Sequence, residues 1–266
     1  MKDDKIISLY TQLIQEELAQ TKDLQKVIRL TVLPTWLRRN AAWMLSKKGM
    51  TSKDAYYIYS YSLCDTDEFG LLKQEGLVAK FTETMSPNSL LKLLNSYGKL
   101  NQKSREVINY AILRHKDKTA RHCAELVNGL SSKELVRNAF STLKKMRADN
   151  ATIGERFLGS NFDSIIPDDI KVAAGDYILG NKPKGKDFYP IISMFSRANQ
   201  FRNKNLLVKA VDMLYKVRKT NEDRVQIITG EINALYYQKG TPRTKAITCT
   251  NEILAQRKVE VEILSR

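Results

Sequence analysis

The chain has 266 residues, of which 42% are hydrophobic, and its formal net charge is +15. This length and apolar content are enough to bury a core, and the absence of any run of about 18 apolar residues excludes a helical membrane span. The three cysteines, Cys64, Cys123 and Cys249, have no paired spacing, and the two histidines are His115 and His122. We therefore expect no disulfide framework and no cofactor. A metal held by the two histidines and Cys123 is the alternative to ordinary helix-surface and core roles.

Positive charge is concentrated in two segments of the chain. Residues 114–147 carry nine basic and three acidic groups, and residues 182–219 carry ten and two, so they hold 14 of the 15 net charges. The first ten residues, MKDDKIISLY, lack the basic, acid-poor character of a transit peptide, so we expect no targeting segment. Such concentrated charge favours a polyanionic partner, RNA, DNA or acidic lipid, whereas the alternative is a solvated face that keeps the protein soluble.

The first predicted elements form a degenerate helix pair over residues 21–45, TKDLQKVIRLTVLPTWLRRNAAWML. Trp36 and Trp43 are seven residues apart, so they fall on one face of the second helix. We interpret both as anchors of the hydrophobic core rather than as platforms on which bases stack.

Six further helices are predicted to begin in a similar way. The clearest is SPNSLLKLLNSYGKL, in which Ser86 is a good N-cap, Pro87 suits the first helical position and the leucines recur at helical spacing. Similar starts occur at Thr51, Ser131, Ile166, Asn203 and Thr241, and the steps between successive starts are 35, 45, 35, 37 and 38 residues.

A second helix is predicted after each of the first five starts, over residues 67–81, 104–115, 153–162, 188–201 and 222–237. Extra residues between His115 and Leu130 account for the longest step. The predicted fold is all-α, a right-handed α-solenoid of about six to seven helix-pair repeats of roughly 35–38 residues. It is one domain over 1–266, with a degenerate cap at 1–50, repeats at 51–240 and C-terminal capping helices at 241–266.

The stretch GNKPKGKD, residues 180–187, is one residue short of a Walker A loop. Such a loop needs Ser or Thr where Asp187 stands, and it follows a buried strand, which nothing here predicts. In the repeat frame the stretch falls between two helices, where Gly and Pro are expected. We interpret it as a turn whose Lys182, Lys184 and Lys186 lie at the edge of a binding surface.

Basic residues recur at the seventh and fourteenth positions of three predicted first helices, two helical turns apart on one side. Cations stacked in this way would suit a phosphate backbone, although an ordinary solvated face is the alternative. The predicted RNA-binding residues are these cations with the adjacent Lys145 and the turn: Lys92, Lys99, Arg137, Lys144, Lys145, Lys182, Lys184, Lys186, Lys209 and Lys216.

We call the stacked cations at the seventh and fourteenth helix positions the ladder. Polar residues beside the ladder are candidates for reading bases: Asn95, Ser96, Asn138, Ser141 and Asp212. Ordinary exposed helix surface is the favoured interpretation of all five. Asp168 and Asp169 are interpreted as favourable charges in the first turn of a helix. No catalytic set of Ser, His and Asp and no paired carboxylates are evident, so we expect no enzymatic activity.

The segments MSPNSLLKLLNSYGKLNQKSREVINYAILRH and LSSKELVRNAFSTLKKM resemble the repeats of organellar octotricopeptide and heptatricopeptide proteins, including those that precede RAP domains. Ser86, Pro87, Leu90, Leu94 and Tyr97 match that repeat pattern, as does Leu100. The resemblance implies an α-solenoid in mitochondria or plastids that binds RNA. The array is short and ends in ILAQRKVEVEILSR without a RAP-like domain, which favours a structural subunit of a mitochondrial ribosome over a sequence-specific factor.

The expected partners are RNA, most concretely ribosomal RNA, and neighbouring proteins of a ribonucleoprotein assembly, with no membrane and no small-molecule substrate. A protein-binding scaffold of HEAT or tetratricopeptide type that selects an acidic partner is the alternative. A mobile RNA-processing or stability factor would use the same cations, because a repeat fold by itself does not fix function.

Overall fold

A computed structural model of the chain describes residues 24–29, 31–64, 73–95, 100–159, 164–196, 203–237 and 244–264. Within these ranges it has fourteen α-helices and no β-strand, so the prediction of an all-α fold is confirmed. The chain divides into two compact units, Met1–Lys118 and Thr119–Arg266. The prediction of one continuous domain stays a prediction.

The first unit has its described helices in consecutive pairs. They are α2 (Leu24–Arg29), α3 (Thr35–Lys48), α4 (Ser52–Ser60), α5 (Gln74–Thr82), α6 (Pro87–Asn95) and α7 (Gln102–Arg114). α2 packs on α3, α4 on α5 and α6 on α7, and further contacts join α2 to α4 and α5 to α7. Buried apolar side chains such as Ile58, Val78 and Ile108 fill these interfaces.

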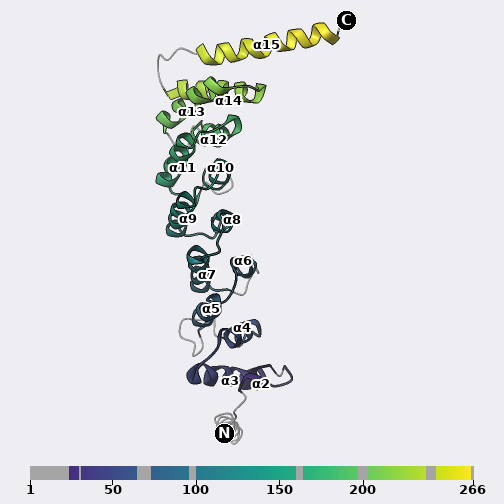
Figure 1. The fold of residues 1–266 in the computed structure, drawn as a ribbon, viewed down its shortest axis with the longest axis vertical. Coiled ribbons are helices and arrows are strands. Elements are labelled where there is room, and N and C mark those ends of the chain that lie inside the picture. The colour runs from purple at the N-terminus through teal and green to yellow at the C-terminus, as the bar shows by residue number, and fades with distance from the viewer. Residues whose placement is uncertain are drawn as a thin grey trace, which may run out of the picture. The chain divides into compact units, whose positions relative to one another are not determined.

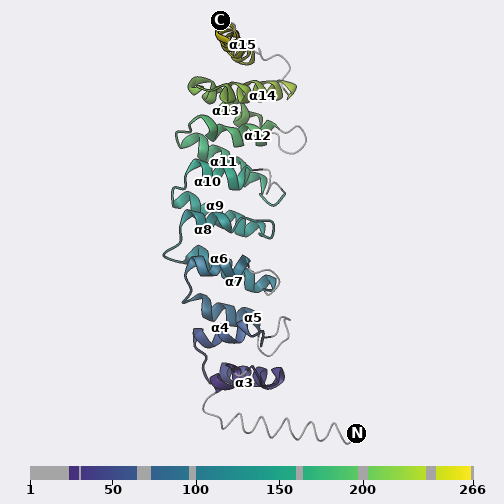
Figure 2. The same ribbon diagram turned by 90° about the vertical axis from the view of Figure 1, so that its right-hand side faces the viewer.

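The second unit holds the other eight described α-helices and one 3-10 helix. They are α8 (Ala120–Glu125), α9 (Lys133–Lys145), α10 (Asn150–Phe157), α11 (Asp168–Gly180), the 3-10 helix η2 (Gly185–Phe188), α12 (Tyr189–Ser196), α13 (Lys204–Val217), α14 (Asn221–Tyr237) and α15 (Thr244–Leu264). Within this unit α8, α10, α12 and α14 form one layer and α9, α11 and α13 the other, as Figure 1 and Figure 2 show. The helices predicted as first members of their repeats therefore share a layer here.

Capping residues set several of the predicted helix starts. Thr51 and Asp54 form a reciprocal capping box at α4, and the Asn203 side chain accepts the Leu206 N–H at α13. Ser86 accepts the Ser89 N–H before α6. At α9 the cap is Ser132 rather than the predicted Ser131, and at α11 no side chain caps the helix. The predicted start at Thr241 lies outside the described residues.

A short helix shifts the repeat frame in the second unit. The extra residues between His115 and Leu130 contain α8, which the Thr119 side chain caps. α8 packs on α9, α10 on α11 and α12 on α13, and these pairs begin with helices outside the predicted set of first helices because α8 adds one helix before α9. α13 also packs on α14, which is the pair predicted there.

The prediction that Trp36 and Trp43 anchor the core is wrong. Their relative exposures are 45% and 36%. The buried residues of α3 are instead Arg38, Ala41, Ala42 and Leu45, which lie on the opposite side of the helix. The small side chains of Ala41 and Ala42 face the neighbouring helices and allow close packing there. The large indole rings lie on the solvent side of α3.

Candidate functional site

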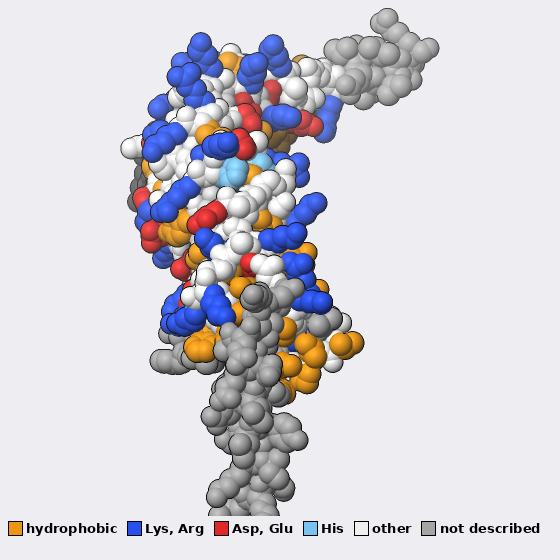
Figure 3. Space-filling model, turned by 60° about the horizontal axis from the view of Figure 1, so that its bottom comes forward, with side chains coloured by type: hydrophobic (Ala, Val, Ile, Leu, Met, Phe, Trp, Pro, Cys, Tyr) orange, Lys and Arg blue, Asp and Glu red, His pale blue; other side chains and the backbone are white. Residues whose placement is uncertain are grey.

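The predicted binding residues that the structure describes are all exposed. Lys92 lies on α6, three of them lie on α9, Lys209 and Lys216 lie on α13, and the remainder lie in the turn and η2. Lys99 and the candidate base reader Ser96 are outside the described residues. Figure 3 shows lysine and arginine side chains over much of the visible surface, so exposure of cations does not by itself define a site.

Arg137 has an intramolecular partner. Its guanidinium donates to both carboxylate oxygens of Asp169, with Nη2 to Oδ1 at 2.9 Å and Nε to Oδ2 at 3.2 Å. The hydrogen bond from Arg137 lowers the pKa of Asp169, which lies in the first turn of α11 as predicted. A phosphate would have to displace this two-point contact, so Arg137 is a weaker candidate than the exposed lysines.

The turn that resembles a Walker A loop is a hydrogen-bonded connection between α11 and α12. α11 ends at Gly180, and the chain enters η2 at Gly185 and α12 at Tyr189. Asp187 accepts hydrogen bonds from the Lys184 N–H at 3.0 Å and from the Asn150 amide on α10 at 3.3 Å. The carboxylate that replaces the Walker hydroxyl therefore fixes the turn, and the interpretation of this stretch as a turn is confirmed.

The lysines of the turn point to solvent because burial alternates along it. Pro183 is buried, whereas Lys182, Lys184 and Lys186 on either side of it are exposed. The turn therefore buries its proline and presents its three lysines to solvent. Lys182 has a φ of 48°, a left-handed conformation that ends α11 sharply.

The connection between α13 and α14 lies beside this turn. Asp223 is buried at the start of α14 and accepts the backbone N–H groups of Lys219 and Thr220 at 2.9 and 3.0 Å. It also accepts the Tyr189 hydroxyl at 3.0 Å, which ties α14 to α12. Burial alone would raise the pKa of Asp223, but these hydrogen bonds outweigh it and lower the pKa.

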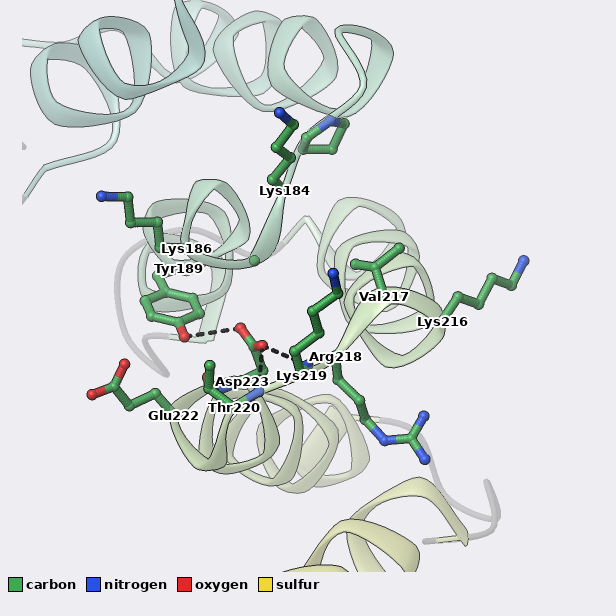
Figure 4. A pocket seen from close by; sticks show the side chains of 12 residues that line it. Lys184, Lys186, Tyr189, Lys216, Val217, Arg218, Lys219, Thr220, Glu222 and Asp223 are labelled. Atoms are coloured by element: carbon green, nitrogen blue, oxygen red, sulfur yellow. Dashed lines mark hydrogen bonds between the residues drawn. The ribbon is translucent and has the colours of Figure 1, made fainter.

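The two connections enclose one pocket of about 690 Å³, which we call the basic pocket. Its cationic lining residues are Lys184, Lys186, Lys216, Arg218 and Lys219, and its acidic ones are Glu222 and Asp223. Figure 4 shows Lys219 reaching toward the turn that carries Lys184, while Lys216 and the Arg218 guanidinium point away. Among the described residues, no carboxylate forms an ion pair with Lys184, Lys186 or Lys219.

Arg218 belongs to a separate cluster that holds α15. Its guanidinium and that of Arg224 both donate to Glu252, at 2.5 and 2.7 Å, and Arg218 also lies 3.8 Å from the Tyr215 ring centroid. The hydrogen bond from Arg218, with that from Arg224, lowers the pKa of Glu252 to about 2. This cluster therefore anchors the C-terminal helix rather than offering a free charge to the pocket.

The predicted RNA-binding residues and the pocket overlap only in part. Lys184 and Lys186 of the turn and Lys216 of the ladder line the basic pocket. The other described predicted residues do not line it: Lys92, Arg137, Lys144, Lys145, Lys182 and Lys209. Lys219 was missed because the predicted residues were taken from fixed positions on helices and from one turn. It nevertheless lies in the most basic segment of the sequence. The spacing of 35 residues between Lys184 and Lys219, about one repeat, was the available signal.

The candidate base readers are dispersed. Asn95 lies on α6, and Asn138 and Ser141 lie on α9. The Asp212 carboxylate accepts the Lys245 ammonium at 2.5 Å, so it joins α13 to α15. None of these residues lines the basic pocket.

The described residues do not gather three side chains of the kind that ligate a metal ion. His122 is buried and its Nδ1 lies 2.9 Å from the Thr119 backbone nitrogen in the cap of α8, and the three cysteines are also buried. Within the same residues, no helix is both long enough and apolar enough to cross a bilayer.

Comparisons of the chain with protein-family models, with curated proteins and with solved structures find no match in any of the three.

Proposed function

We propose that this protein is a non-catalytic RNA-binding helical-repeat protein that holds phosphate groups at the basic pocket. The observation that carries the proposal is that Lys184, Lys186 and Lys219 line the same pocket, none of them with an ion-pair partner among the described residues. They come from two connections, α11 to α12 and α13 to α14, which packing among α12, α13 and α14 holds together.

The charges favour a polyanion over an acidic small molecule. The surrounding segment, residues 182–219, has a balance of ten basic to two acidic groups, and this excess extends well beyond the pocket. A single anion would need only the pocket, whereas a phosphate backbone gains from every nearby cation through counterion release. The pocket volume, about 690 Å³, is sufficient for a phosphate with part of its nucleotide.

The repeat architecture is part of the same proposal. Layers of alternating helices within each unit support α-solenoid repeats of roughly 35–38 residues. The right-handed twist and the total of six to seven pairs stay predictions. The resemblance of the Ser86 unit to organellar octotricopeptide repeats supports a structural subunit of a mitochondrial ribosome as the most concrete form of the proposal.

The pocket is tested by binding of a fluorescent single-stranded RNA over a series of salt concentrations. We expect Lys184→Gln, Lys186→Gln and Lys219→Gln together to lower affinity at least about tenfold and to flatten the salt slope by about 2, because each single-strand phosphate contact contributes about 0.7. The matched control removes three exposed lysines elsewhere, Lys53, Lys80 and Lys133. Equal losses in both variants, or no RNA binding by the unchanged protein, would contradict the proposal.

The ribosomal form is tested in cells. Ultraviolet crosslinking of the tagged protein, followed by sequencing of attached RNA, should place crosslinks at one site of ribosomal RNA. Crosslinks spread over messengers would instead support a processing factor, and recovery of an acidic protein without RNA would favour the scaffold.

A further inference from the structure

One side of α3 combines exposed aromatic and cationic side chains. Trp36, Arg39, Trp43 and Lys47 are all exposed and recur at steps of three or four residues, so they form a stripe along the helix, which we call the α3 face. It lies opposite the buried side of α3, where Ala41 and its neighbours pack. These four side chains are therefore exposed because they lie on the solvent side of a regular helix.

Large exposed aromatic side chains need an explanation, since burying each one would be favourable. Trp36 and Trp43 have relative exposures of 45% and 36%, and tryptophan is among the residues most enriched at binding surfaces. The same helix has no acidic residue, and it ends in Lys47 and Lys48. An occupant of this face must accordingly offer flat apolar surface together with negative charge.

The arrangement within the stripe matches that requirement for a single nucleic-acid strand. The Lys47 ammonium lies over the Trp43 ring, 5.9 Å from its centroid, so the stripe already pairs a cation with an aromatic surface. The two tryptophans are separated by about 10 Å along the helix axis. That separation is too large for both rings to enclose one base, and it suits two different bases of one strand.

We propose that the α3 face binds single-stranded RNA by stacking bases on Trp36 and Trp43, with Arg39 and Lys47 against the adjoining phosphates. This inference rests on the proposed RNA-binding function and adds a base-contacting surface in the first unit. Every base has a flat face, so stacking of this kind is sequence-tolerant. It also requires unpaired bases, so a duplex of the same length should bind this face poorly.

Intrinsic fluorescence provides a specific test, because the chain has two tryptophans and both are on α3. Titration of the full chain with a single-stranded oligoadenylate should quench tryptophan emission, and an inorganic polyphosphate of similar charge should not. Trp36→Ala with Trp43→Ala should lower oligoadenylate affinity about 5- to 150-fold for each base that stacks. The control is Leu130→Ala, which shortens an exposed apolar side chain in the second unit.

The outcomes separate this inference from the proposed function. Oligoadenylate binding without quenching, and with unchanged affinity in the double tryptophan variant, would overturn the α3 face and leave the basic pocket in place. No oligoadenylate binding at all would overturn both. Quenching that persists in the variant lacking Lys184, Lys186 and Lys219 would show that the α3 face acts without the pocket. An equal response to polyphosphate, or a blue shift with anionic phosphatidylserine vesicles alone, would overturn base stacking.

Discussion

The basic pocket and the α3 face are both cationic, but they differ in what accompanies the charge. The basic pocket has one aromatic lining residue, Tyr189, which is only partly exposed and whose hydroxyl donates to Asp223, and most of the other lining residues are charged. On α3 the rings of Trp36 and Trp43 are themselves exposed. Charge without accessible rings recognises phosphate, whereas charge interleaved with rings also recognises unpaired bases. The comparison therefore predicts different responses to salt and to strand pairing.

Charge reversal in the pocket should have the largest effect. Lys184→Glu with Lys219→Glu replaces two phosphate contacts with two repulsions, and we expect about a 100-fold or greater loss of affinity for single-stranded RNA at low salt. The loss should shrink as salt rises. The control, Lys53→Glu with Lys133→Glu, changes the net charge equally on exposed lysines outside the pocket. Fluorescence anisotropy measures both, and a loss of the same size in the control would remove the distinction between pocket and general charge.

Two glycine substitutions compare the packing of the units. A Cβ at Gly230 would lie 2.6 Å from the Val211 side chain, so Gly230→Ala should lower the free energy of unfolding by about 1–3 kcal/mol. A Cβ at Gly76 would meet nothing within 4 Å on the exposed side of α5, so Gly76→Ala should raise it by about 0.5–1 kcal/mol. Urea unfolding monitored by circular dichroism tests both. A neutral Gly230→Ala would contradict the close approach of α13 and α14.

The Glu252 cluster should make the docking of α15 depend on pH. Because the folded pKa is about 2, below the ordinary value of 4.5, the ion pairs stabilise the protein above pH 4.5. Protonation removes this contribution as the pH falls from 4.5 toward 2. Glu252→Gln should therefore cost about 1–2 kcal/mol at pH 7, after allowance for solvent screening, and progressively less in acid. A pH-independent difference between the two proteins, measured by urea unfolding, would argue against the pairing.

Removal of the Tyr189 hydroxyl should have a small effect on stability and sharpens the comparison. Tyr189→Phe deletes one hydrogen bond to Asp223, for which we expect a loss of about 1 kcal/mol in unfolding free energy. RNA affinity should stay unchanged, because the hydroxyl faces the carboxylate and not the lysines. A large affinity loss with normal stability would mean that the ring or hydroxyl contacts the ligand.

Local signals in the sequence predicted the helix starts better than the tertiary environment of single side chains. Thr51, Ser86 and Asn203 cap helices as expected, because an N-cap interacts with residues two or three positions away. The exposure of Trp36 depends instead on which helices cover α3. The partner of Arg137 is 32 residues away, so its spacing on α9 gave no sign of it.

The candidate site was predicted only in part, because some of its residues have local signals and others are placed by tertiary packing. The turn with Lys184 and Lys186 is visible in sequence because its Gly and Pro residues interrupt the helical pattern. Lys219 joins it through packing of α12, α13 and α14, which no local pattern contains. α8 was missed because a helix of six residues is too short for a periodic signal.

Mapping the contacts of bound RNA tests the central claim most directly. The purified full chain would be crosslinked to single-stranded RNA by ultraviolet light, digested, and analysed by mass spectrometry for peptides that carry nucleotides. We predict crosslinked peptides from residues 182–189 and 216–223 around the basic pocket, and from α3, with the pocket crosslinks lost in the Lys184, Lys186 and Lys219 variant. Crosslinks confined to other surfaces, or none despite saturating RNA, would contradict RNA binding through these residues.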